Sequence, residues 1–267
     1  RYHQFLNEAA SYLDSRWDAD PSDIEIAAGL RAINYELLEV AIQKGKLTTA
    51  LGYAEHNLEI ATSLLDQELE PDENYQWIYM DALSEASFIR LQLDPSKAGE
   101  IREEILDARK QYPNAEVPLY LILQQGHCEL ALGKTKSAYH LYYEICKEYP
   151  YDVDEILAQI QREMEPVAPD RLPEVERVFG LYKEYWEAAS NYDEGLYRLE
   201  DPATAIEPEL LNGNYWAAYN AGKLRFESAL ILESEQMMPI DKLQEEMEAF
   251  TRISAQYAHV LLLDGRW

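Results

Sequence analysis

The stretch Leu119–Pro150 constrains the fold most, because its small residues and its proline fall at fixed distances from one another. Gly133 follows the apolar run 130–132 and supplies the left-handed backbone that ends a helix at low cost. Ala138 stands five residues later and opens the packed face of a second helix, which Pro150 ends. Two helices this short cannot bury their apolar faces alone, so the pattern predicts stacking on neighbouring pairs.

The same stretch resembles a tetratricopeptide repeat (TPR), since Gly126, Gly133, Ala138, Tyr142 and Pro150 stand at the spacings of that repeat. The resemblance implies an all-α fold, a TPR-like α-solenoid of antiparallel helix pairs. It also implies a mode of action, which is binding another protein or a peptide on a curved helical surface.

Weaker copies of the pattern flank this unit. Tyr112-Pro113 repeats Tyr149-Pro150 at a distance of 37 positions, and Gly45 is followed by Ala50 as Gly133 is by Ala138. After residue 152 the pattern returns only in 257–265, which resembles a first helix reaching its turn glycine. We therefore expect TPR-like repeats in 1–165 and a less regular helical segment, truncated at its end or covered by a partner or second copy, in 166–267. The boundary falls in 165–173, where three of nine residues are proline.

In TPR arrays the first helix of each pair lines the ligand-binding face through positions 2, 5, 9 and 12 of the repeat. The resemblance places Tyr120, Leu123, His127 and Leu130 at these positions. Chaperone-binding members carry lysine and asparagine there, whereas this chain has Leu123 and His127. The expected ligand is therefore not an acidic carboxylate tail.

Charge narrows the class of partner. The chain has 23 basic and 50 acidic residues, a net charge of −27, so DNA, RNA and anionic membranes are repelled. Two interpretations stay open: the charge keeps the protein in solution, or it steers a basic partner. No apolar run reaches the 18 or so residues that a membrane span needs.

Capping residues, prolines and 3.6-residue periodicity predict helices throughout, with few glycines and few alternating β-branched runs to favour sheet. The expected helices span 2–16, 22–44, 47–69, 73–92, 95–111, 116–132, 135–148, 152–164, 171–199, 208–235 and 241–263.

Aromatic residues gather in the C-terminal part, where Tyr215, Trp216 and Tyr219 are further candidates for partner binding. One interpretation is a packed core with tyrosine hydroxyls at its rim. The other is a groove of aromatic anchors for a peptide or a small apolar ligand.

The chain carries no recognisable catalytic or metal-binding motif. Its five histidines show no pairing four residues apart, and it has neither a phosphate-binding glycine loop nor a nucleophile elbow. Cys128 and Cys146 are expected as buried thiols, with a disulfide between them as the alternative. We expect no enzyme activity, no metal and no cofactor.

Two functions remain. The first is a non-enzymatic helical-repeat scaffold or adaptor. The second is a TPR-like periplasmic transport-accessory or small-ligand-binding protein whose aromatic C-terminal part closes over a pocket. The Tyr-Pro helix endings resemble those of bacterial envelope TPR lipoproteins, so the expected location is the cytoplasm or the bacterial periplasm, leaning to the cell envelope. Self-association through the C-terminal end is also expected, because a terminal repeat helix exposes an apolar stripe.

Overall fold

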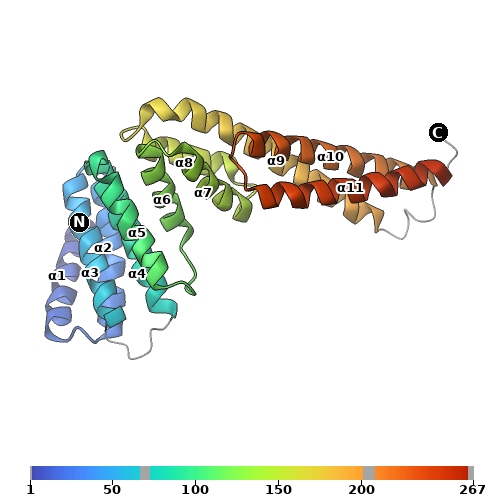
Figure 1. Cartoon of the computed structure of the whole chain (residues 1–267). Coiled ribbons are helices and arrows are strands. Elements are labelled where there is room, and N and C mark those ends of the chain that lie inside the picture. Colours follow the sequence, from blue (N-terminus) through green and yellow to red (C-terminus); the bar gives the residue numbers. More distant parts are fainter. Residues whose placement is uncertain (1, 67–72, 201–207, 264–267) are drawn as a thin grey trace. The chain divides into compact units, whose positions relative to one another are not determined.

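The computed structural model describes residues 2–66, 73–200 and 208–263, and over these residues it is all-α without a strand, as predicted (Figure 1). Two short 3₁₀ turns, Pro95–Lys97 and Pro169–Arg171, stand directly before the α-helices that begin at Ala98 and Leu172. The helices are α1 (Tyr2–Ala19), α2 (Ile24–Gln43), α3 (Leu47–Asp66), α4 (Glu73–Leu93), α5 (Ala98–Gln111), α6 (Leu119–Ala131), α7 (Thr135–Glu148), α8 (Val153–Met164), α9 (Leu172–Leu199), α10 (Pro208–Ser234) and α11 (Ile240–Leu263).

Contacts between residues divide the chain into two compact units. The first comprises Arg1–Ala138 with Pro166–Ala168, and the second comprises Tyr139–Glu165 with Pro169–Trp267. The boundary between the repeats and the C-terminal segment expected near residue 165 rests on proline composition and stays a prediction, because contact alone defines these units.

In the first unit, helices α1 to α6 pack in chain order, each against the next, and α4 also packs against α6. Figure 1 shows these helices side by side from blue to green. Small residues let them approach closely, since Ala50, Ala54 and Ala86 are fully buried beside Ile89. Stacking of this kind buries faces that a single helix pair would expose, which is the behaviour expected of a helical repeat.

Two glycines end helices by the same local geometry. Gly45 and Gly133 have φ values of 67° and 73°, the left-handed conformation that glycine adopts without strain. The N–H of Lys46 bonds to the carbonyl of Ala41 at 2.9 Å, and the N–H of Lys134 bonds to the carbonyl of Glu129 at 2.8 Å. These bonds close the last turns of α2 and α6. The prediction that Gly133 lies in the turn between two helices is confirmed.

Capping explains where the predicted helix ends shift. Helix α2 begins after Asp23 and not at the predicted residue 22, because the side chain of Asp23 accepts bonds from the N–H groups of Glu25 and Ile26 and so caps the helix. Helix α6 begins at Leu119 and not at 116, because Pro118 precedes it in an extended conformation. The predicted positions 67–69 lie outside the described residues.

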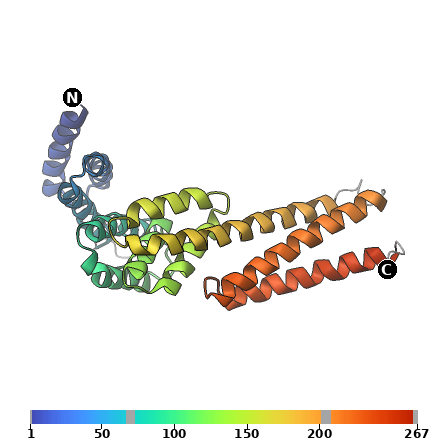
Figure 2. The same ribbon diagram turned by 90° about the horizontal axis from the view of Figure 1, so that it is seen from above.

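In the second unit, α10 packs against both α9 and α11, and α8 packs against α9. Figures 1 and 2 both show α9, α10 and α11 as long helices lying side by side. Aromatic rings fill the interior next to α7, where Tyr143 contacts Tyr182 at 5.8 Å and Phe179 contacts Tyr182 at 5.5 Å between ring centroids. Within the described part of the chain, no helix combines the length and the apolar character that a bilayer crossing needs.

Candidate partner-binding site

Two carboxyl groups on α4 face the helices before it in the first unit. Asp81 and Glu85 are four residues apart, so they lie on one side of the helix. Arg31 of α2 places Nη2 3.4 Å from Oδ2 of Asp81, and Asn57 of α3 donates from Nδ2 to Oε2 of Glu85 at 3.4 Å. Three helices thus bring one cation and one amide to a pair of acids.

The electrostatics of this pair are unbalanced. The pKa of Glu85 is raised to about 7, chiefly by burial and then by the neighbouring charge of Asp81, while Asn57 and Arg31 oppose the rise. Burial also raises the pKa of Asp81, against the effect of Arg31. One guanidinium therefore serves two partly buried carboxyl groups, and each of them lacks a full counter-charge.

Tyr35 of α2 also lies near these carboxyl groups and near two further glutamates. Burial raises the pKa of the Tyr35 hydroxyl on α2, and the charges of Glu39, Glu85, Asp81 and Glu36 add to that rise. Tyr35 keeps 47% of its surface exposed, so this acidic surface reaches solvent. We call Arg31, Tyr35, Asp81 and Glu85, together with Asn57 beneath them, the α2–α4 acidic face.

Asn57 adds a hydrogen-bond acceptor to the acidic face. The residue is 1% exposed, and its Oδ1 accepts no hydrogen bond from any described residue. A buried acceptor without a donor costs free energy. The same burial keeps Asn57 Oδ1 out of reach of a ligand, so the group open to a ligand cation is the carboxyl group of Glu85.

The four ligand positions predicted on α6 do not belong to the α2–α4 acidic face. Leu123, His127 and Leu130 are buried, at 4%, 0% and 0% exposure. Tyr120 is partly exposed, with its ring 6.4 Å from that of Phe88. The resemblance to a repeat assigns residues to positions along a helix, but it does not predict which of their side chains the neighbouring helices bury.

The predicted C-terminal candidates differ among themselves. Trp216 is 58% exposed, while Tyr215 and Tyr219 are partly buried. The ring of Tyr219 lies 5.3 Å from that of Tyr257 and 5.8 Å from that of Phe250. Tyr219 therefore packs between α10 and α11, and Trp216 alone of the three presents most of its side chain to solvent.

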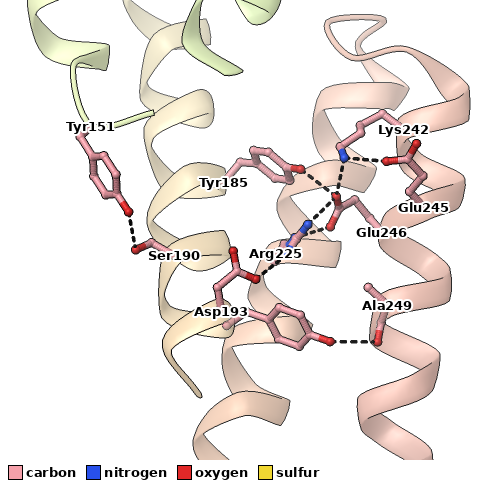
Figure 3. A network of polar contacts seen from close by, with 10 residues as sticks. Tyr151, Tyr185, Ser190, Asp193, Arg225, Lys242, Glu245, Glu246 and Ala249 are labelled. Carbon is pink, nitrogen blue, oxygen red and sulfur yellow. Dashed lines mark hydrogen bonds and ion pairs between the residues drawn. The ribbon is translucent and has the colours of Figure 1, made fainter. Parts of the chain in front are cut away.

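A second charged cluster, in the second unit, is fully paired. Glu246 of α11 is 1% exposed, and its Oε1 accepts bonds from Tyr185 at 2.8 Å and from Arg225 Nη2 at 2.9 Å (Figure 3). Nζ of Lys242 lies 3.5 Å from Oε1 of Glu246. The guanidinium carbon of Arg225 also lies over the ring of Tyr192, 5.3 Å from its centroid. Burial alone would lower the pKa of Arg225, but bonding to Glu246 raises it. This cluster joins α9, α10 and α11 and needs no outside partner.

The second unit also has a pocket of about 390 Å³ beside α9. Trp186 and Lys183 of α9 line it with Tyr151, whose hydroxyl lies 3.5 Å from that of Ser190 (Figure 3). Lys183 is paired with Asp154 at 2.5 Å. None of the large buried tyrosines of this unit lines the pocket, so its aromatic surface comes from Trp186 and Tyr151.

Neither cysteine forms a disulfide. Cys128 and Cys146 are both buried free thiols, and burial raises the pKa of each to about 12. They are therefore poor nucleophiles at neutral pH. Among the residues that the structure describes, no group of three histidine, cysteine or acidic side chains is arranged to hold a metal ion.

Sequence reasoning did not single out the α2–α4 acidic face. The signal was a like-charged pair four residues apart, but a chain with 50 acidic residues contains many such pairs. Only burial distinguishes this pair, and burial depends on helices 28 or more positions away. Comparison with models of known families, with curated proteins and with solved structures found no match.

Proposed function

We propose that this chain is a non-enzymatic, TPR-like helical-repeat scaffold that binds another protein, and that the α2–α4 acidic face takes a basic segment of that partner. The observation that carries the proposal is Glu85, a partly buried carboxyl group that shares one guanidinium with Asp81. An arginine or lysine side chain from a partner supplies the missing charge.

The charge of the whole chain supports the same class of partner. With a net charge of −27, the protein attracts basic molecules over a distance and repels acidic ones. Long-range attraction of this kind raises the rate of encounter, whereas the partly buried Asp81 and Glu85 determine where the cation comes to rest. Attraction and location are therefore separate properties, and experiment can separate them.

The first test uses a fluorescent peptide of four arginines alternating with glycines, with a matched peptide carrying glutamates as the control. Fluorescence anisotropy at moderate salt measures binding to the wild type, to Asp81→Asn/Glu85→Gln and to Glu59→Gln/Glu100→Gln. The second pair removes the same number of carboxyl groups from exposed positions of α3 and α5. We expect binding at least about tenfold weaker for the first pair, because charge pairs in desolvated positions contribute most to affinity.

Two results would contradict the proposal. Equal weakening by both pairs would mean that the peptide responds only to net charge. No binding of the arginine peptide even at low salt would mean that the acidic face takes no cation.

A small-ligand protein is the second candidate, and the pocket lined by Trp186 favours it. A cavity of about 390 Å³ is within the range that small molecules occupy. Native mass spectrometry of the purified protein distinguishes the two candidates. A retained small molecule that Trp186→Ala removes supports the pocket, whereas a retained peptide or protein that Asp81→Asn/Glu85→Gln removes supports the scaffold.

A further inference from the structure

Helix α10 presents large apolar side chains to solvent along one face. Trp216, Leu224, Leu230 and Ile231 keep 58%, 58%, 42% and 45% of their surface exposed. At 100° per residue these four positions fall within about 120° of the helix circumference. We call them, with Lys223 and Glu227 between them, the outer α10 face.

Apart from Arg225, which pairs with Glu246, the opposite side of α10 is apolar as well. Ala218, Ala221, Ala229 and Leu232 are buried, on the helix that packs against both α9 and α11. A surface helix normally has one apolar and one polar side, and a helix that is apolar on both is typical of one covered on both. Helices α9 and α11 cover one side of α10, and among the described residues of the second unit none covers the outer face.

Charge indicates what that cover is. In a chain of net charge −27, the outer α10 face carries one cation and one anion, Lys223 and Glu227, 3.7 Å apart. It is locally neutral, so a second copy of this acidic protein meets little repulsion there. A strongly basic partner, by contrast, would find more counter-charge on almost any other surface.

The order of residues on the face suits pairing with itself. When two α10 helices run antiparallel about an axis midway between Lys223 and Glu227, each Lys223 stands opposite the Glu227 of the other copy. The two Leu224 side chains then meet near the axis. Trp216 of one copy then lies within about one helical turn of Leu230 and Ile231 of the other copy. Such a contact is isologous, the arrangement found in most dimers with two-fold symmetry.

We propose that the outer α10 face is a homodimer interface, in which two copies of the chain pair antiparallel through α10. From Trp216 to Ile231 the face is about 24 Å long, which places the buried area near the lower end of specific interfaces, roughly 1,000 Å². The dimer therefore exchanges with the monomer and forms as the protein concentration rises. Salt strengthens it, because screening weakens the repulsion between two acidic molecules. This inference is independent of the proposed function.

Sedimentation velocity over a series of protein concentrations and salt concentrations tests the dimer. We expect a monomer–dimer equilibrium in the wild type and at least a tenfold weaker one in Leu224→Glu. Tyr12→Glu is the matched control, since Tyr12 of α1 is also an exposed apolar residue, at 61%. Lys223→Glu weakens the dimer by placing like charges opposite each other, and Lys223→Glu/Glu227→Lys restores it. Circular dichroism confirms that each variant is folded.

Cross-linking gives a second test, which detects the dimer directly and does not depend on weakening it. Leu224→Cys is expected to form an intermolecular disulfide under mild oxidation much faster than Gln244→Cys, an exposed position on α11. The native Cys128 and Cys146 are buried and do not interfere. A wild type that stays monomeric at all concentrations, equal cross-linking of the two cysteine variants, or failure of the charge-swapped double variant to restore pairing would overturn the proposal.

Discussion

Gly195 of α9 lies so close to Ala218 of α10 that a Cβ atom on Gly195 would stand 3.0 Å from the Cα of Ala218. A contact that short is tighter than nearly all Cβ contacts, and the nearest atoms include backbone, so a methyl group on Gly195 would force α10 to shift by a few tenths of an ångström. The long helices of the second unit therefore depend on a hydrogen atom at this crossing.

We expect Gly195→Ala to destabilise the protein by about 1–3 kcal/mol through overpacking. Gly180 of the same helix is the matched control, because a Cβ there meets no atom within 4 Å. Gly180→Ala should stabilise by about 0.5–1 kcal/mol, as is usual for glycine inside a helix. Urea unfolding of both variants measures the two effects, and changes of the same sign would contradict the close crossing.

The buried pair of Arg225 and Glu246 gives a second prediction. Arg225→Met leaves the carboxylate of Glu246 with less compensation in a nearly dry place, so we expect a loss of about 3 kcal/mol or more. Arg225→Met/Glu246→Leu removes both charges and should recover most of that loss. Thermal unfolding of the two variants distinguishes these outcomes. If the double variant is less stable than Arg225→Met, the pair is not the reason for the loss.

Glu85 predicts a dependence of stability on pH. Its pKa rises from 4.5 to about 7 on folding, so between these values the folded chain holds a proton that the unfolded chain has released. Stability then falls as the pH rises through this window, by about 3 kcal/mol in total, and the loss is complete about one pH unit above 7. Glu85→Gln should remove this component. Unfolding curves at several pH values, with Glu59→Gln as the control, measure the difference.

A Glu85→Gln variant with the same pH profile as the wild type would show that Glu85 ionises normally in the folded protein. In that case the partial burial of Asp81 and Glu85 would not restrict where a cation binds.

Gln236 gives a prediction about backbone strain. It has a φ of 60° after α10, and the N–H of Met237 bonds to the carbonyl of Leu232 at 2.7 Å. This is the same helix ending as at Gly45 and Gly133, but with a side chain in the left-handed conformation. We expect Gln236→Gly to stabilise by about 1 kcal/mol, measured by urea unfolding. Gln236→Val should destabilise, because a branched Cβ increases the strain.

The local sequence determined the helices and most of their ends. Gly45, Gly133 and Asp23 act through bonds to residues within one or two turns, so short-range patterns are sufficient to find them. Because such signals are local, the predicted helix 135–148 has the same bounds as α7 in the structure. The all-α class follows from the same signals.

Only the tertiary structure decided which polar side chains matter. Glu246 is distinguished from dozens of other acids by Arg225, 21 positions away, and by Tyr185, 61 positions away. Glu85 is distinguished by burial against helices far earlier in the chain, whereas His127, singled out from its place in the repeat, is covered completely. The free energy of a charged group depends on the water, charges and donors around it, and helix packing assembles that environment from distant segments.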